Sequence, residues 1–146
     1  MSVPWSRNIR RVLVDSAAYY AFMDVKSLEH SRSVVVLEQL ATQHRRLFTT
    51  NCVIAETHSL LLNQVGRDIA ARALEWIDEG ATTIVRVSTA DERRAREIIV
   101  LHDDKDYSLT DATSFAVMER LRIGVAFTFD RHFAQYGFAA LGLDEP

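Results

Sequence analysis

The hydrophobic positions of this chain occur in two patterns, short continuous runs and longer stretches with helical spacing. Short apolar runs bounded by polar residues predict buried strands, whereas the longer periodic stretches predict helices. We expect strands at residues 11–15, 47–50, 83–87, 125–129 and 138–141. We expect helices at residues 16–23, 29–43, 51–65, 67–79, 88–101 and 108–121, with a short turn or helix at 131–136.

Capping residues and glycines mark several of these expected helix ends. Asn51 is a plausible N-terminal cap, and Gly66 and Gly80 end the two helices that follow it. The segment from Ser88 to Glu92 carries the signal of a capping box. Helical spacing in the second helix indicates one apolar face at four positions, Val34, Leu37, Leu40 and Ala41.

Continuous apolar strands that alternate with helices predict an α/β fold. Such strands form a central, mainly parallel sheet of four or five strands with helices on both faces, which gives three layers. Right-handed crossovers place the carboxyl ends of the strands at one edge, where ligands bind. The chain shows no internal repeat or low-complexity segment, so we expect one domain over residues 1–146 with a core of about 11–141.

The composition of the chain limits the cellular compartments in which we expect it. Hydrophobic residues make up 48% and charged residues 25% of the chain, which is ordinary for a soluble globular protein. No apolar run reaches the roughly 18 residues of a membrane span, and the N-terminus lacks the core of a signal peptide. Cys52 is the single cysteine, which excludes an internal disulfide. We therefore expect a cytoplasmic protein without membrane contact.

Net charge by itself does not indicate a nucleic-acid-binding protein. The formal net charge is −3, and of the 17 basic residues only Lys26 and Lys105 are lysines. Arginine suits bidentate contact with phosphate, but a compositional bias of the source genome explains the excess of arginine over lysine equally well.

Four acidic residues, Asp15, Glu56, Asp111 and Asp130, lie near the ends of expected strands or the starts of expected helices. Carboxylates that are crowded together raise one another's pKa unless a cation neutralises them. Carboxylate oxygens without supporting histidine or cysteine favour Mg²⁺ or Mn²⁺ over zinc. A site of this kind usually performs phosphoryl or phosphodiester chemistry.

Each acid also has a structural interpretation. Asp15 and Asp130 are placed to act as helix N-caps, and Asp111 follows Ser108 at capping-box spacing. Glu56 is open to interpretation as a solvated helix residue.

Helical phase favours an inward orientation for Asp111. At about 100° per residue it shares a face with Ser114 and with the apolar stripe of Phe115, Met118 and Leu121. A charge on that face needs a partner, which a shared metal ion would supply. Ser114 would then be able to hydrogen-bond a ligand or an attacking water.

The sequence leaves the orientation of Glu56 and the roles of two histidines open. Glu56 flanks a stripe that contains Val53 and Leu60, so it faces either the cleft or solvent. His58 and His132 lie near acidic positions, where they either assist substrate binding or are partly exposed helix residues. Glycine-rich nucleotide loops, zinc-binding histidine pairs and the serine-hydrolase elbow are not found in the sequence.

Two C-terminal segments, residues 107–121 (YSLTDATSFAVMERL) and 126–138 (AFTFDRHFAQYGF), resemble the signature of PIN-domain ribonucleases. The likeness is greatest to the VapC-like toxins of bacterial type II toxin–antitoxin pairs. Residues 12–16 (VLVDS) are similar to the first strand and first acid of that family, and residues 51–57 (NCVIAET) to its second acidic helix. The resemblance extends from Arg11 to Leu141.

The resemblance implies a PIN-like fold and a metal-dependent endoribonuclease. It assigns Asp15, Glu56, Asp111 and Asp130 to the binding of one or two Mg²⁺ or Mn²⁺ ions. Asp15 and Asp111 are the expected direct ligands, and no other cofactor is implied. Ser114 and Thr128 match polar positions beside these acids.

The implied reaction is attack of water on an RNA phosphodiester in a single-stranded or looped region. The implied partners are a small antitoxin that covers the acidic cleft and a second copy of the chain in a homodimer. The alternative is a catalytically weak PIN domain that binds RNA or serves in assembly. A receiver-like phosphoacceptor domain is disfavoured because no lysine follows Lys105.

Overall fold

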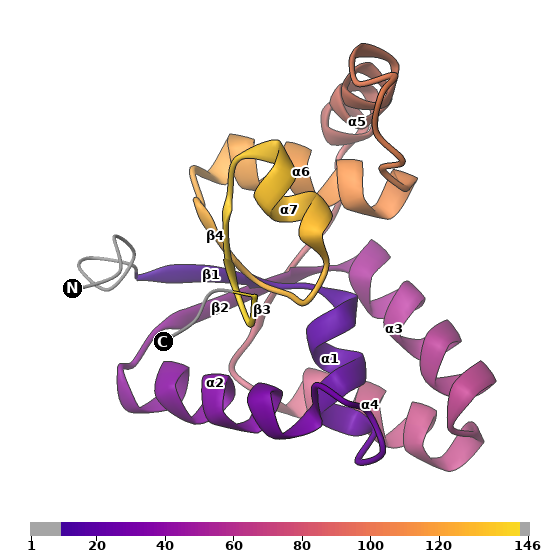
Figure 1. The fold of residues 1–146 in the computed structure, drawn as a ribbon, viewed down its shortest axis with the longest axis vertical. Helices are drawn as coiled ribbons and strands as arrows, with labels where there is room; N and C mark the ends of the chain where they lie inside the picture. Colours follow the sequence, from indigo (N-terminus) through magenta and orange to yellow (C-terminus); the bar gives the residue numbers. More distant parts are fainter. Residues whose placement is uncertain (1–9, 144–146) are drawn as a thin grey trace.

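Figure 1 shows a computed structural model of the chain, which describes residues 10–143. Within this range five strands form one sheet: β1 (Arg11–Val14), β2 (Arg46–Thr50), β3 (Thr83–Val85), β4 (Val125–Phe127) and β5 (Ala139–Leu141). Their order is β3-β2-β1-β4-β5, and every pairing is parallel. Seven helices connect them: α1 (Ser16–Met23), α2 (His30–Thr42), α3 (Asn51–Gln64), α4 (Arg67–Glu79), α5 (Thr89–Leu101), α6 (Leu109–Leu121) and α7 (Arg131–Tyr136).

Both faces of the sheet are covered, so the predicted three-layer α/β fold is confirmed (Figure 1). Leu13 packs in a core cluster with residues of α5, α6 and α7. Its neighbours Val12 and Val14 point to the other face and pack with residues of α1, α2 and α4. Adjacent residues of a strand face opposite sides of the sheet. Both faces of this sheet are buried, which explains the continuous apolar runs.

Several element ends agree with the sequence prediction, and others are corrected. The bounds of α1, α4 and α7 are as predicted. The cap of α3 is Thr50, whose hydroxyl accepts from the Val53 N–H at 3.0 Å, and not Asn51. The Asn51 side chain instead accepts from the Val87 N–H at 2.9 Å, so β3 ends at Val85 and not at 87.

The apolar stripe predicted for α2 is also only partly buried. Leu40 is in the core together with Val36, but Ala41 is exposed. Val34 and Leu37 are half-buried and line a groove on the molecular surface. The sheet therefore covers only part of the apolar face of α2.

The sheet reverses its direction of winding between β1 and β4. The chain proceeds from β1 to β2 on one side, whereas β4 pairs with β1 on the other side. Ligands of open α/β sheets bind beyond the strand ends at such a switch point. The Asp15 N–H donates to the Phe127 carbonyl at 3.0 Å, so the ends of β1 and β4 are joined there.

Gly142, directly after β5, supports this switch point from the edge of the sheet. Its φ is +108°, and a Cβ atom there would lie 2.7 Å from the Thr128 carbonyl oxygen. The Thr128 N–H donates to the Leu141 carbonyl at 3.0 Å. A side chain at position 142 would therefore push Thr128 out of place.

An ion pair joins α5 to α6. Asp91, which is 3% exposed, accepts from Nε and Nη2 of Arg120, each at 2.8 Å. Asp91 also completes the capping box with Ser88 at the start of α5. These bonds, that from Arg120 first among them, hold the pKa of Asp91 below its ordinary value.

We predict that Arg120→Ala lowers the free energy of unfolding by about 1–3 kcal/mol, because it leaves the buried Asp91 carboxylate without its cation. Arg93→Ala is the matched control: Arg93 is exposed on α5 and has no ion pair among residues 10–143. The control is expected to change stability by about 0.5 kcal/mol or less. Urea denaturation measures both, and equal effects would refute this role of the ion pair.

Candidate metal centre and apolar groove

Three of the four predicted acids cap helices at the carboxyl edge of the sheet. Asp15 is the N-cap of α1, and Asp130 is the N-cap of α7 and accepts from the His132 N–H at 2.9 Å. Asp111 forms a capping box with Ser108 at the start of α6. In each case one carboxylate oxygen accepts the cap bond. The structural interpretation of these acids is therefore correct. The second oxygen of Asp111 and of Asp130 accepts no hydrogen bond within residues 10–143, and that of Asp15 accepts a 3.5 Å bond from the Ser16 hydroxyl.

Asp15 is only 2% exposed and lies beside Thr128. The Thr128 hydroxyl donates to Asp15 Oδ2 at 2.8 Å and accepts from the Asp130 N–H at 2.9 Å, so it links the two strand-end aspartates. Burial raises the pKa of Asp15 to about 7; the bond from Thr128 opposes this rise, and the charges of Asp111 and Glu56 add to it. In the absence of a cation, ionised Asp15 is therefore unfavourable.

Glu56 lies on α3 and reaches α1, where it accepts from the Ser16 hydroxyl. The stripe assumed from the sequence is wrong, because Leu60 is exposed. The buried face of α3 consists of Val53, Thr57 and Leu61. Glu56 is half-buried beside this face, so its carboxylate faces the first acid and not open solvent.

Asp111 has the inward orientation that helical phase predicts, with 6% exposure. Ligand atoms of Asp111, Asp130 and His132 all lie within 4.8 Å of one another. The four acids therefore approach one another as two linked pairs. Asp15 and Glu56 meet at Ser16, whereas Asp111 and Asp130 meet at His132.

His132 is the site residue that sequence reasoning did not assign. Its only signal was its place two residues after Asp130, because the contact with Asp111 spans 21 residues of chain. His58, the other histidine considered, makes no hydrogen bond or ion pair to the four acids in the described part of the chain.

The chemistry of these residues fits a hard divalent cation. Four carboxylates supply oxygen ligands, which Mg²⁺ and Mn²⁺ prefer. Ser114 Oγ, one turn beyond Asp111, is fully buried and has no hydrogen-bond partner among residues 10–143. Burial raises the pKa of Asp15, so a cation bound beside it would favour its ionised form.

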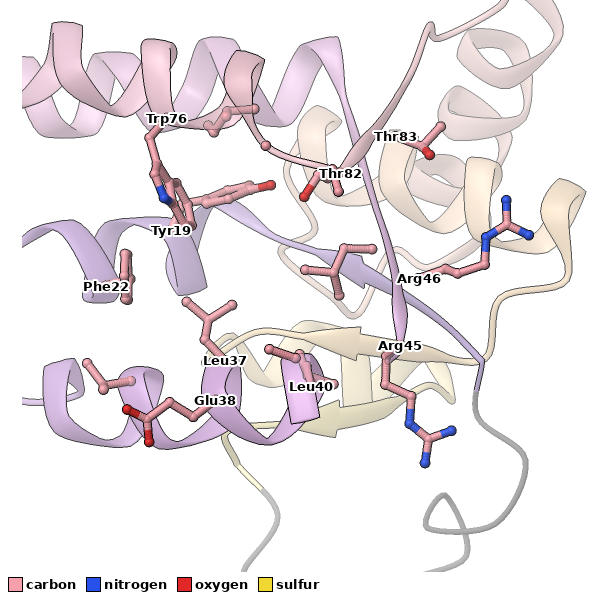
Figure 2. A pocket seen from close by; sticks show the side chains of 16 residues that line it. Tyr19, Phe22, Leu37, Glu38, Leu40, Arg45, Arg46, Trp76, Thr82 and Thr83 are labelled. Atoms are coloured by element: carbon pink, nitrogen blue, oxygen red, sulfur yellow. The ribbon is translucent and has the colours of Figure 1, made fainter. Parts of the chain in front are cut away.

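A separate apolar groove lies between α1, α2 and α4, above the starts of β2 and β3 (Figure 2). Its volume is about 860 Å³. Trp76, which is 42% exposed, stacks on Phe22 with ring centroids 5.0 Å apart. Glu38 lies at the α2 side, and Arg45 and Arg46 lie at the end away from Trp76. None of the four acids lines this groove.

None of the seven helices within residues 10–143 has the length and hydropathy that a membrane span requires.

Comparison with known proteins gives consistent relatives. The PIN domain family matches residues 12–139. The 23S rRNA-specific endonuclease VapC20 of Mycobacterium tuberculosis is 42% identical over 97 residues, which are 63% of this chain and 70% of VapC20.

Two crystal structures resemble the chain. That of Mycobacterium tuberculosis VapC20, described as a sarcin–ricin loop cleaving toxin, has a TM-score of 0.80 and 30% identity over 88% of this chain and 96% of its own. That of FitAcB from Neisseria gonorrhoeae has a TM-score of 0.65 and 14% identity over 89% of this chain and 96% of its own, a likeness in fold alone.

We predict that the cation-free wild-type protein loses stability as the pH is raised, and that Asp15→Asn removes this loss. The pKa of Asp15 rises from 3.8 to about 7 on folding. Between these values the folded state holds a proton that the unfolded state has released, so its stability falls as the pH rises. The loss is on the order of a few kcal/mol and is complete above about pH 7.

Urea denaturation in EDTA at pH 5 and pH 8 tests this, with the exposed Asp103→Asn as the control. Wild type and control should lose more stability between the two pH values than Asp15→Asn does. Identical pH dependence in all three proteins would contradict the assignment.

Proposed function

This chain belongs to the PIN-domain family, and we propose that it is a single-domain, metal-dependent endoribonuclease that acts as the toxin of a type II toxin–antitoxin pair. The family match and the comparisons with VapC20 confirm the PIN-domain family that the sequence segments resemble. The observation that carries the proposal is the convergence of Asp15, Glu56, Asp111 and Asp130 at the switch point of the sheet.

Each acid has a part in the proposed reaction. The buried Asp15 and Asp111 would hold the cation directly, and Glu56 and Asp130 would complete the coordination or orient water. When bound, Mg²⁺ or Mn²⁺ lowers the pKa of water and neutralises charge on the phosphate. The Ser114 hydroxyl, which has no partner within residues 10–143 and is fully buried, would hydrogen-bond the substrate or the attacking water only where one of them enters beside Asp111.

The proposed substrate is a loop of ribosomal RNA. VapC20 is named for its action on 23S rRNA and is 42% identical to this chain over the matched segment. A loop is favoured because acidic residues at the edge of a sheet reach a phosphate that is splayed from an RNA helix more readily than one within the helix.

The proposed antitoxin binds as an amphipathic helix in the apolar groove. The groove presents Trp76 and Phe22 to an apolar ridge, as helix-binding grooves do. Glu38 and the pair Arg45 and Arg46 at its rim favour a helix with a basic residue near the first and acidic residues near the second. From there the antitoxin chain would extend over the acidic cleft.

Homodimerisation is part of the same proposal. Val100 and Leu101 at the end of α5 and Leu109 at the start of α6 are 77%, 69% and 55% exposed. If these side chains form one contiguous apolar patch, they would favour contact with a second chain.

We predict that Asp111→Asn abolishes RNA cleavage and toxicity while the fold survives, because it removes a negative ligand. The expected loss of cleavage rate with Mn²⁺ is roughly 100-fold or more. The exposed Asp103→Asn is the control and should cleave as wild type does. A cleavage assay with Mn²⁺ measures the loss of rate, and mapping of RNA ends after induced expression identifies the substrate.

Persistent cleavage by folded Asp111→Asn would contradict the metal-site assignment. Wild-type protein that binds RNA but cleaves none with Mn²⁺ would instead favour the binding or assembly module. New ends outside ribosomal RNA would refute the proposed substrate and leave the proposed activity in place.

We predict that Trp76→Ala uncouples toxicity from its neutralisation. Loss of a stacked aromatic anchor should weaken antitoxin binding roughly 10-fold or more, whereas RNA cleavage should not change because Trp76 is not part of the acidic site. Co-expression with the cognate antitoxin tests this. Full neutralisation of Trp76→Ala would show that the groove is not the docking surface.

A further inference from the structure

His132 contacts two of the acidic residues through one ring nitrogen. Its Nδ1 lies 2.9 Å from Asp111 Oδ2 and 3.4 Å from Asp130 Oδ1. A carboxylate only accepts hydrogen bonds, so Nδ1 carries the hydrogen and is the donor. Burial alone lowers the pKa of His132, but the bond to Asp111 and the charges of Asp130, Asp111 and Asp106 raise it above its ordinary value.

The ring of His132 is held in this orientation from two sides. Its backbone N–H is the one that Asp130 caps at 2.9 Å. Its ring stands edge-on to Tyr107, with centroids 5.3 Å apart, and Tyr107 in turn packs against the core residue Phe115. The donor nitrogen is therefore positioned by packing and not by a flexible surface contact.

The contact divides the oxygens of each acid into two classes. Asp111 Oδ2 accepts from both Ser108 N–H and His132, and Asp130 Oδ1 accepts from the His132 N–H and lies near its ring. No hydrogen bond within residues 10–143 reaches Asp111 Oδ1 or Asp130 Oδ2. Each carboxylate is thus fixed by one oxygen and open at the other.

We propose that His132 is a positioning residue of the cation site, which ties Asp111 to Asp130 and turns one free oxygen of each toward the ion. The inference rests on the proposed metal-dependent function, which it deepens. In this arrangement Nδ1 does not bind the ion, because it carries the hydrogen that faces the carboxylates; Nε2 is the ring nitrogen with a free lone pair, and it has no part in the proposed site. Groups that orient metal ligands in this way contribute 10–100-fold to metal affinity in other proteins.

Calorimetric titration with Mn²⁺ tests the proposal on wild type, His132→Ala and His132→Asn. The alanine variant should bind Mn²⁺ about 10–100-fold more weakly. The asparagine variant should stay within about threefold of wild type, because its amide N–H has the place of Nδ1–H. His58→Asn, a half-buried histidine on α3, is the matched control and should bind as wild type does.

Two results would overturn the inference: equal Mn²⁺ affinity of wild type and His132→Ala, or equal losses in the alanine and asparagine variants with both folded by circular dichroism. Pulsed electron paramagnetic resonance of bound Mn²⁺ should show no directly coordinated nitrogen, and a nitrogen that His132→Ala removes would make His132 a ligand instead. Failure of wild type to bind Mn²⁺ would overturn the metal site as well. Absence of RNA cleavage, with Mn²⁺ binding that depends on His132, would overturn only the proposed activity.

Discussion

The buried charge of Asp15 is the constraint on which the site depends. The sheet changes winding direction beside this residue, so the ends of β1 and β4 bring it against Thr128 and near Asp111. Among residues 10–143 no lysine or arginine pairs with Asp15, and its pKa rises to about 7. A fold that places such a group at a ligand-binding edge is poised for a divalent cation, which would hold the carboxylate ionised.

Helix capping and ligand presentation are the same contacts in this molecule. Asp15, Asp111 and Asp130 each use one oxygen to satisfy the start of a helix, an interaction that contributes about 1 kcal/mol per cap. That bond also fixes the carboxylate, so the remaining oxygen has a defined direction. Thr128 and His132 then connect the fixed groups to one another. The cost of gathering negative charge is thereby offset in part before any ion binds.

How well the sequence predicts each feature depends on how far apart in the chain the interacting residues lie. Local patterns were sufficient for α1, for the inward face of α6 at Asp111 and for the parallel sheet, since these depend on spacing and burial. The cap of α3 was misassigned because Asn51 bonds a strand end 36 residues away. The orientation of Glu56 depends on Ser16, 40 residues earlier, and the role of His132 on Asp111. No periodicity in the sequence encodes such pairings between elements.

The central claim, that Asp15 and Asp111 jointly hold a divalent cation, is tested most directly by anomalous diffraction from crystals of the wild-type protein grown with Mn²⁺. The account predicts an anomalous peak at the carboxyl ends of β1 and β4, with carboxylate oxygens of both residues about 2 Å away. Saturating Mn²⁺ with no peak at these strand ends, or a peak that neither carboxylate contacts, would contradict it.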